Sequence, residues 1–447
     1  MFTTPFYINS PIWLQNVILS VRAQFRKKLR ENTKSEVMLG SLQKLEKSEF
    51  ELKKYSGERL REAIKNAILH VPYYKKEADI KNVSLEAFPY IDKENLINCP
   101  LGFKSEVKPQ LIVKGSTSGT TGTSISIPQS LESVIREQAF ISRHLKWAGF
   151  EKGDRRAWIR GDMVVPVKQK EPPFWRYSRF ENMIYLSSFH MMKETFGLYI
   201  QAMTDYDVNI IIAYPSSIAM LAKYLDFNDE YYPGKIKSVI TSSEVLFPED
   251  RTVIEKRFCC KVFDWYGQFE RVAAIANCEH GRYHVLTDYS HVEFSEVGDG
   301  RYEIIGTNYN NHVYPLIRYK TGDHVVLSKE TECPCGRVYP MVESIEGRVG
   351  DYLVGEDGQK VHILNHIPKG VKGLLACQFI QDSPLNIEVF AVVVPTVFND
   401  QQQQLLVKNV KDRLGQRVAV KVVRVDALQR TRNGKVRQAV CSIKDII

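Results

Sequence analysis

The stretch VNIIIAYPS at residues 208–216 decides the fold class of this chain. It is a short, continuously apolar run that ends in proline and serine, which is typical of a buried strand followed by a helix. Four similar runs lie between residues 155 and 266, namely RRAWIRG, NMIYLSS, KSVITSSEV and KVFDWYG. Helical spacing fills the intervals near 191–206, 217–227 and 248–258. This alternation predicts α/β architecture with mostly parallel sheets covered by helices.

Polar residues follow three of these strands. They are Tyr214-Pro215-Ser216, the segment Thr241-Ser242-Ser243-Glu244, and Asp264-Trp265-Tyr266-Gly267. Ligands of parallel sheets bind beyond the carboxyl ends of the strands, so these segments are expected to line a pocket. The alternative is that the same residues only cap the helices that follow.

Composition excludes several classes of protein. A chain of 447 residues with 44% hydrophobic and 25% charged residues predicts a globular protein of two or three domains. Apolar runs fall short of the roughly 20 residues that a spanning helix needs, and the N-terminus lacks a leader pattern. We therefore expect a cytoplasmic location, where the eight cysteines are free or bind metal. Lys and Arg are spread without a nucleic-acid reader motif, so no nucleic-acid partner is expected.

The N-terminal hundred residues are predicted to be helical. In PFYINSPIWLQNVILSVRAQFRKKLREN (5–32), apolar residues alternate with Arg and Lys. This pattern suits peripheral contact with an anionic membrane, or a helix that packs on the body of the protein. The net charge of +9 fits a membrane surface, a polyanionic substrate or an acidic carrier protein equally well.

The stretch KGSTSGTTGTSISIP (114–128) combines glycines with Ser and Thr hydroxyls, as a phosphate-binding loop does. A flexible surface hairpin is the alternative. The loop lacks the glycine–lysine pair of a Walker A motif, and Thr117 stands where a nucleophile elbow needs serine. The segment is predicted to form a strand, a loop and a second strand.

Thr-Ser-Gly-Thr-Thr-Gly at 117–122 resembles the phosphate loop of the adenylate-forming enzymes, the acyl-CoA synthetase superfamily. Four further motifs resemble this superfamily and follow in its order: DWYGQFE (264–270), YPLIRYKTGD (314–323), IEGRVGD (345–351) and QRTRNGK (429–435). The helical start ending in HVPYY is similar to the phenylacetate–coenzyme A ligase branch, which includes relatives in polysaccharide biosynthesis.

The resemblance implies a role for each motif, with ATP, Mg²⁺ and coenzyme A as cofactors or co-substrates. Lys435 and Thr120 would act in catalysis, and Glu270 would act there while holding Mg²⁺. Asp323 would bind the ribose hydroxyls, with Arg348 nearby. The remaining nucleotide contacts would come from Ser116, Thr117, Ser118, Gly119, Thr121, Gly122, Ser243, Glu244, Tyr266 and Gly267.

The resemblance also implies the domain plan. Residues 1–100 would form the helical part of a large domain, residues 101–348 its adenylation core, and residues 349–447 a small, mobile α+β domain. The small domain would rotate about a hinge near 347–352 between the two half-reactions. The chain departs from the superfamily pattern at Phe269, at the end of the phosphate loop, and at Arg-Val-Gly-Asp in the hinge. These departures weaken any transfer of phenylacetate specificity.

Cysteines suggest a separate metal site. The motifs CEHGRYH (278–284) and CPCG (333–336) supply Cys278, Cys333 and Cys335 with His284 for tetrahedral Zn²⁺. His280 is a rival ligand, and free cysteines are the alternative. The metal would be structural, and the resemblance extends to zinc sites suspected in the phenylacetate ligase branch.

These observations predict an enzyme that activates a small carboxylic acid as its acyl-adenylate, releases pyrophosphate and transfers the acyl group to coenzyme A. Two alternatives stay open. The acceptor could be a carrier protein or an amine in cell-surface polysaccharide biosynthesis, or the protein could be a non-catalytic nucleotide-binding scaffold. The sequence leaves the acid and the oligomeric state open.

Overall fold

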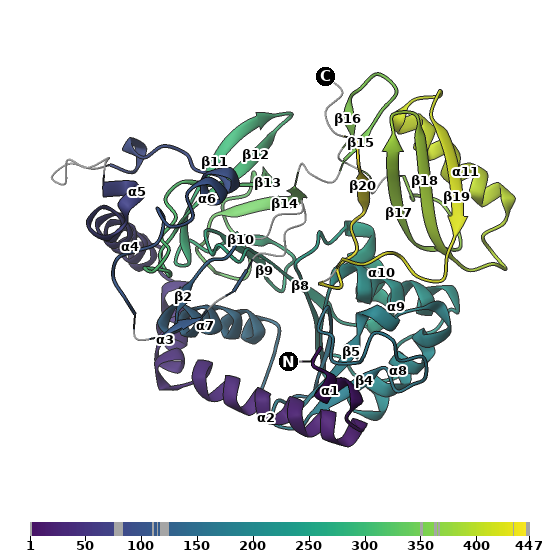
Figure 1. Ribbon diagram of the computed structural model, residues 1–447, viewed down its shortest axis with the longest axis horizontal. Coiled ribbons are helices and arrows are strands. Elements are labelled where there is room, and N and C mark those ends of the chain that lie inside the picture. Colours follow the sequence, from purple (N-terminus) through teal and green to yellow (C-terminus); the bar gives the residue numbers. More distant parts are fainter. Residues whose placement is uncertain are drawn as a thin grey trace. The chain divides into compact units, whose positions relative to one another are not determined.

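The computed structural model describes residues 2–75, 84–109, 111–113, 115–116, 125–348, 352–361, 364, 367–431 and 433–443, with backbone alone for residues 348 and 360 (Figure 1). The chain divides into two compact units, each assembled from separate stretches of sequence. The first unit comprises Met1–Val21, Gly153–Val262 and Arg348–Ile447. The second unit comprises Arg22–Lys152 and Phe263–Gly347.

The first unit contains the parallel sheet predicted from residues 208–216. Its strands lie in the order β4-β5-β3-β6-β7, and β5, β3, β6 and β7 run parallel. Their bounds are β3 Arg156–Arg160, β4 Trp175–Ser178, β5 Met183–Ser187, β6 Ile210–Ala213 and β7 Ser238–Ser242. All residues of β5 and β6 are buried, as expected for strands covered on both faces. β4, which the sequence analysis missed, pairs antiparallel with β5 at the edge.

Three helices follow strands of this sheet, and α9 and α10 pack together beside them (Figure 1). They are α8 Phe196–Asp205, α9 Pro215–Phe227 and α10 Pro248–Phe258, after the short turns η2 Ser188–His190 and η3 Lys193–Thr195. Proline at the first helical position starts both α9 and α10, because its fixed φ suits the first turn. In α10, acidic residues in the first turn and basic residues in the last complement the helix dipole.

The C-terminal part of the first unit has a sheet of its own, ordered β19-β18-β17-β20. Its elements are β17 Leu374–Ser383, β18 Asn386–Val393, α11 Asp400–Leu414, β19 Ala419–Arg424 and β20 Ala439–Cys441, preceded by the hairpin of β15 Leu353–Val354 and β16 Lys360–Val361. Leu375, Val392, Val394 and Leu428 join the apolar core built around β3–β7. The predicted α/β class with a small α+β C-terminal domain is confirmed.

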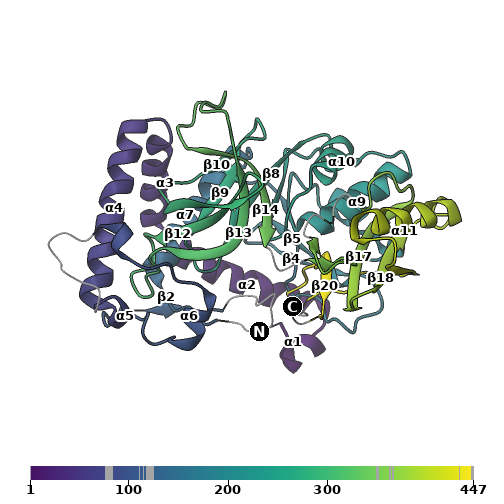
Figure 2. The same cartoon turned by 90° about the horizontal axis from the view of Figure 1, so that it is seen from above.

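Helices of the second unit include three that pack side by side, α3 with α4 and with α7 (Figure 2). Their bounds are α3 Thr33–Leu45, α4 Glu49–His70 and α7 Leu131–Trp147, with the shorter α5 Pro72–Lys75, η1 Leu85–Ala87 and α6 Lys93–Asn98. Each long helix begins at a side-chain cap, from Asn32, Ser48 and Ser130 respectively.

Strands of the second unit pair antiparallel, in contrast to the mostly parallel sheets that the sequence predicted. The order is β8-β9-β10-β14-β13-β12-β11. Antiparallel pairing joins β8 to β9, β9 to β10, β10 to β14, β13 to β12 and β12 to β11. Their bounds are β8 Lys261–Gly267, β9 Ala274–Asn277, β10 Tyr283–Val285, β11 Ser290–Gly298, β12 Arg301–Asn308, β13 Tyr319–Leu327 and β14 Met341–Arg348. Short turns join several of these strands, and such connections permit antiparallel pairing only.

Around the glycine-rich loop, the predicted pair of strands is shorter than expected. β1 Ile112–Val113 pairs with β2 Gln129–Ser130, and Ser116 bridges Ser126. The predicted alternation holds at Ile125 and Ile127, which are both buried.

The N-terminal segment forms α1 Pro5–Asn9 and α2 Ile12–Arg30. Among the described residues, no helix is both long enough and apolar enough to span a bilayer.

Candidate functional site

Polar side chains gather at the carboxyl ends of β3, β6 and β7 in the first unit. Arg160 ends β3, Tyr214 follows β6, and Ser243 follows β7 with a left-handed φ of 73°. The guanidinium carbon of Arg160 lies 5.0 Å from the ring centroids of both Trp158 and Tyr214, and Nη2 donates a hydrogen bond to Ser243 Oγ. Burial raises the pKa of Tyr214, so its phenol stays protonated and can donate.

The segment 429–436, here called the lysine loop, lies at these same strand ends. Tyr214 Oη donates to the carbonyl of Asn433 at 3.0 Å, and the N–H of Val436 donates to Glu244 Oε1 at 3.0 Å. The other carboxylate oxygen of Glu244 accepts from the N–H of Ser216 in the first turn of α9, at 3.1 Å. Glu244 therefore links β7, α9 and the lysine loop.

The lysine loop is a tight turn held by its own hydrogen bonds. Thr431 N–H donates to the Lys435 carbonyl at 2.9 Å, and Lys435 N–H donates back to Thr431 Oγ1 at 3.2 Å. Arg430 Nη1 donates to the Gly434 carbonyl at 2.7 Å. Lys435 is therefore presented from a constrained turn.

Two glycines allow the lysine loop to approach β3 closely. A Cβ on Gly161 would lie 1.6 Å from the Asn433 carbonyl oxygen, and one on Gly434 would lie 2.5 Å from the Gly161 Cα. Gly434 also has φ of 72°, which side chains disfavour. Contact between these backbones requires glycine at both positions.

In the second unit, the predicted nucleotide residues Tyr266 and Asp323 are in contact. Tyr266 Oη donates to Asp323 Oδ2 at 2.8 Å, and Gln268 Nε2 donates to the same oxygen at 2.8 Å. Asp323 N–H donates to Thr321 Oγ1 at 3.0 Å. Asp323 and the predicted Mg²⁺ ligand Glu270 are both buried. The strands thus hold a fixed, buried carboxylate at Asp323.

Part of the predicted phosphate site lies outside the described residues, namely Thr117, Ser118, Gly119, Thr120, Thr121 and Gly122. At its start, a Cβ on Gly115 would lie 2.2 Å from Phe269 Cζ. Phe269, one of the departures from the superfamily pattern, thus packs on the base of the loop. Of Arg348, which ends β14, the backbone alone is described.

Cys278, His284, Cys333 and Cys335 form a cluster in which all ligand atoms lie within 4.8 Å of one another. Cys278 Sγ is 3.6 Å from Cys333 Sγ, and Cys335 Sγ is 3.4 Å from His284 Nε2. Burial lowers the pKa of His284 to about 4, so the imidazole is neutral and able to ligate at neutral pH. His280, the rival ligand, is exposed and outside the cluster.

These four donors fit Zn²⁺. Ligands at zinc–sulfur and zinc–nitrogen distances of about 2.3 and 2.0 Å stand roughly 3.5–3.8 Å apart in a tetrahedron. Turns at both ends of the cluster set this spacing: Cys278 N–H donates to Arg282 O, and Gly336 N–H donates to Cys333 O. Buried His284 Nδ1 lacks a hydrogen-bond partner among the described residues.

Comparisons with known proteins find relatives along most of the chain. Residues 353–441 match the protein-family model of the CapK C-terminal domain. The chain is 27% identical to protein CapK of Staphylococcus aureus, covering 98% of this chain and 99% of that protein. It is 23% identical to a phenylacetate–coenzyme A ligase of Aromatoleum evansii, over 90% of this chain and 97% of that protein.

A solved structure has a similar fold. The crystal structure of 2-hydroxyisobutyryl-CoA ligase in the postadenylation state matches with a TM-score of 0.64 and 17% identity, covering 87% of this chain and 89% of that one. The chain is thus similar along most of its length to CapK and to a phenylacetate–coenzyme A ligase, and it shares the fold of an acyl-CoA ligase.

The sequence analysis missed several polar residues that the structure brings into contact. Gln268 lies inside the motif DWYGQFE, and Arg160 lies at the end of a predicted strand. Both could have been predicted as site residues, because ligands bind at the ends of such strands. Arg143, on helix α7, forms a buried ion pair with Asp288, which follows β10. No local sequence pattern predicts this pair, because the two residues are far apart in sequence.

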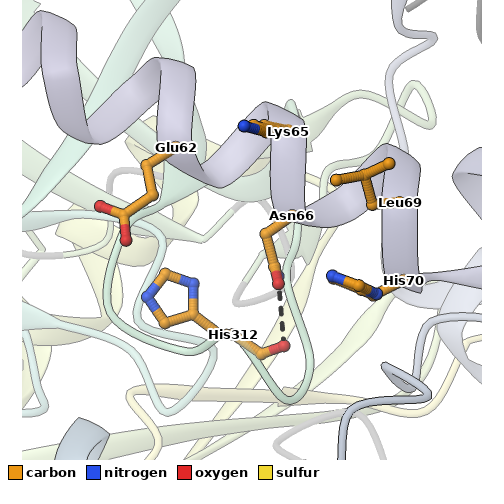
Figure 3. Close-up of a pocket in the computed structure, with 6 residues that line it drawn as sticks. All are labelled: Glu62, Lys65, Asn66, Leu69, His70 and His312. Atoms are coloured by element: carbon orange, nitrogen blue, oxygen red, sulfur yellow. Dashed lines mark hydrogen bonds between the residues drawn. The ribbon is translucent and has the colours of Figure 1, made fainter.

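A surface hollow lies elsewhere, between α4 and the loop carrying His312 (Figure 3). Asn66 Nδ2 donates to the His312 carbonyl at 3.3 Å across it. The hollow is lined by Glu62, Lys65, Asn66, Leu69, His70 and His312. It contains none of the predicted site residues.

Proposed function

We propose that the chain activates a carboxylic acid with ATP, forms the acyl-adenylate with release of pyrophosphate, and transfers the acyl group to the thiol of coenzyme A. Similarity to a phenylacetate–coenzyme A ligase over 90% of the chain, together with the five ordered motifs, supports the reaction class. The observation that carries the proposal is the lysine loop held at the strand ends by Tyr214 and Glu244. There, Lys435 belongs to a loop positioned by both strand ends and α9.

In the proposed first half-reaction, a carboxylate oxygen attacks the α-phosphorus and the bond to pyrophosphate breaks. Both reactants are anions, so the site has to neutralise charge and align the groups. Lys435 would meet the charge that develops on the phosphate and carboxylate oxygens. Loop 115–123 would hold the phosphates, with Ser116, Thr120 and its other hydroxyl residues as donors.

Nucleotide binding is assigned to the second unit's buried carboxylates. Asp323, fixed by Tyr266 and Gln268, would accept hydrogen bonds from ribose hydroxyls. Glu270 would hold Mg²⁺, which would neutralise phosphate charge during the reaction. Either Tyr266 or the backbone segment around Ser243 and Glu244 would face the adenine, and Arg348 would lie nearby at the hinge.

Zn²⁺ is proposed at Cys278, His284, Cys333 and Cys335, with a structural role. The cluster offers four protein ligands, as closed structural sites do. The metal would join the β9–β10 turn to the loop before β14.

The decisive experiment is acid-dependent exchange of labelled pyrophosphate into ATP across a panel of carboxylic and amino acids. We expect exchange with one acid, and Lys435→Ala should reduce it about 100-fold or more, as loss of a transition-state cation does. Lys408→Ala, an exposed lysine of α11, is the matched control and should retain full exchange. Exchange that survives in Lys435→Ala would remove this lysine from the proposal. No exchange with any acid, together with retained ATP binding, would favour the scaffold alternative.

An acceptor other than coenzyme A is tested separately, because the chain is similar to CapK. Residues 353–441 match the CapK C-terminal domain, and the comparison with protein CapK covers 98% of this chain. In this alternative, the acyl group passes to a carrier protein or an amine in polysaccharide biosynthesis. Single-turnover release of AMP from the preformed acyl-adenylate, with and without coenzyme A, separates the two. Acceleration by coenzyme A supports the first proposal. Unchanged release with coenzyme A, but acceleration by an amine or a carrier thiol, supports the second.

A further inference from the structure

Helix α2 exposes large apolar side chains, while several of its polar side chains point inward and bind the sheet. Its inward side binds the edge of the sheet through polar side chains: Asn16 Oδ1 accepts from the N–H of Tyr177 at 2.9 Å, and Ser20 Oγ accepts from the N–H of Arg179 at 3.0 Å. Gln15 Oε1 accepts from Arg176 in the same strand. Leu19 and Ala23 are buried on this same inward side, so both polar and apolar contacts fix α2 to the protein.

The outward side carries large apolar residues at helical spacing. Trp13 and Phe25 are each 66% exposed, and Val17 and Val21 between them are exposed as well. The four stand four residues apart, so they form one stripe along α2. Phe6 of α1 adds a further exposed ring. Single exposed apolar residues are common, but an aligned stripe of this kind indicates a binding surface.

Charge identifies the kind of partner. Residues 1–30 contain no Asp or Glu. The last turn of α2 is basic, with Lys27, Lys28 and Arg30. Lys28 continues the exposed stripe after Phe25, and Lys27 is exposed beside it. A helix with an apolar stripe and a cationic end suits an anionic lipid surface, where the rings enter the acyl boundary and the cations meet headgroups.

We propose that α1 and α2 form a peripheral docking surface for an anionic membrane. Stripe and cations lie on the one continuous helix α2, which Figure 2 shows. Its hydrogen bonds to β4 and Arg179 hold the helix with Trp13 and Phe25 exposed. The proposal does not depend on the acid or acceptor assigned above. It places the enzyme at the membrane as a surface-bound protein.

Flotation of the full chain with vesicles tests the proposal. We expect binding to vesicles of phosphatidylcholine mixed with phosphatidylglycerol, weak binding to phosphatidylcholine alone, and loss of binding at high salt. Trp13→Ser/Phe25→Ser should weaken binding about tenfold or more, since it removes two rings from the stripe. Phe50→Ser/Phe180→Ser, which changes two other exposed rings, is the matched control and should bind as the wild type does.

A charge variant distinguishes binding to anionic lipid from nonspecific adsorption through apolar side chains. Lys27→Glu/Lys28→Glu should lose the preference for anionic vesicles, and Lys168→Glu/Lys170→Glu, two other exposed lysines, should keep it. Pyrophosphate exchange without vesicles should be equal in all variants, which shows that they are folded. Equal binding by the stripe variant and its control would overturn the proposal. So would a dimer in sedimentation velocity that Trp13→Ser/Phe25→Ser dissociates, because a second copy would then cover the stripe.

Discussion

Arg160 shows how single residues set the chemistry of the strand ends. Its guanidinium lies beside the Trp158 and Tyr214 rings and bonds to Ser243, which is held in a left-handed conformation. A serine with positive φ costs free energy, and such strain is commonly found at functional sites. Arg160 therefore provides a fixed cation next to the lysine loop, where an anionic substrate is proposed to react.

Gly161 offers a test of the lysine loop that leaves every proposed chemical group in place. In Gly161→Ala, the new methyl group would overlap the Asn433 carbonyl, so the loop could not adopt its docked position. We expect pyrophosphate exchange to fall about 100-fold, the scale of a displaced catalytic group. ATP binding should be unchanged, as measured by calorimetry.

The control for this change is Gly40→Ala, in helix α3, where a Cβ meets nothing within 4 Å. It should keep full exchange. Wild-type exchange in Gly161→Ala would show that the docked loop is not the form that supports adenylation.

At the scale of elements, the cysteine cluster joins two turns that belong to different hairpins. Cys278 and Cys333 are 55 residues apart in sequence, and a metal between them would close that loop. We expect one equivalent of zinc by elemental analysis, and its loss in Cys335→Ser. The free energy of unfolding should fall by about 2–4 kcal/mol, the range of a lost cross-link. Denaturant titration with and without chelator measures this.

The two histidines supply an internal control for the metal. His284→Ala should lose zinc, because His284 lies within the cluster, whereas the exposed His280→Ala should retain it. The opposite result would move the ligand to His280, and a chelator without effect on stability would contradict a structural metal.

At the scale of the whole molecule, a buried histidine makes stability depend on pH. His144 is 3% exposed, its Nε2 lies 3.3 Å from the Asn277 carbonyl, and burial lowers its pKa to about 3. Between its ordinary pKa of 6.5 and about 3, the unfolded state binds a proton that the folded state excludes. Stability contributed by neutral His144 is therefore present above pH 6.5 and is lost as the pH falls, by up to about 1.4 kcal/mol per pH unit.

Urea denaturation at a series of pH values between neutrality and the onset of acid unfolding checks this. His144→Gln should be less stable near neutrality and should show a shallower decline with acid. His280→Gln, which changes an exposed histidine, should follow the wild type. A wild-type slope in His144→Gln would assign the pH dependence to other groups.

Sequence patterns predicted some elements far better than others, for physical reasons. β6 and β7 were predicted because buried parallel strands have continuous apolar runs, and α9 and α10 because helical spacing follows those runs. β4 was missed because an edge strand such as WRYS has little apolar character. The contact of Tyr266 with Asp323 joins residues 57 apart, and no local spacing encodes such a distance. Cysteine and histidine spacing, by contrast, named the four residues that the structure brings together.

The anchoring of α2 on β4 has a consequence for handling the protein as a reagent. Asn16 and Ser20 occupy backbone N–H groups at the free edge of β4, so a chain that begins after Arg30 would present that edge uncovered. Uncovered edges pair with those of other molecules. We expect such a shortened protein to form concentration-dependent aggregates in light scattering, while removal of residues 1–4 should not cause them. A soluble, monodisperse shortened protein would contradict this. Helix α2, which carries the stripe proposed to bind a membrane, thus also covers the edge of β4 and prevents pairing with another molecule.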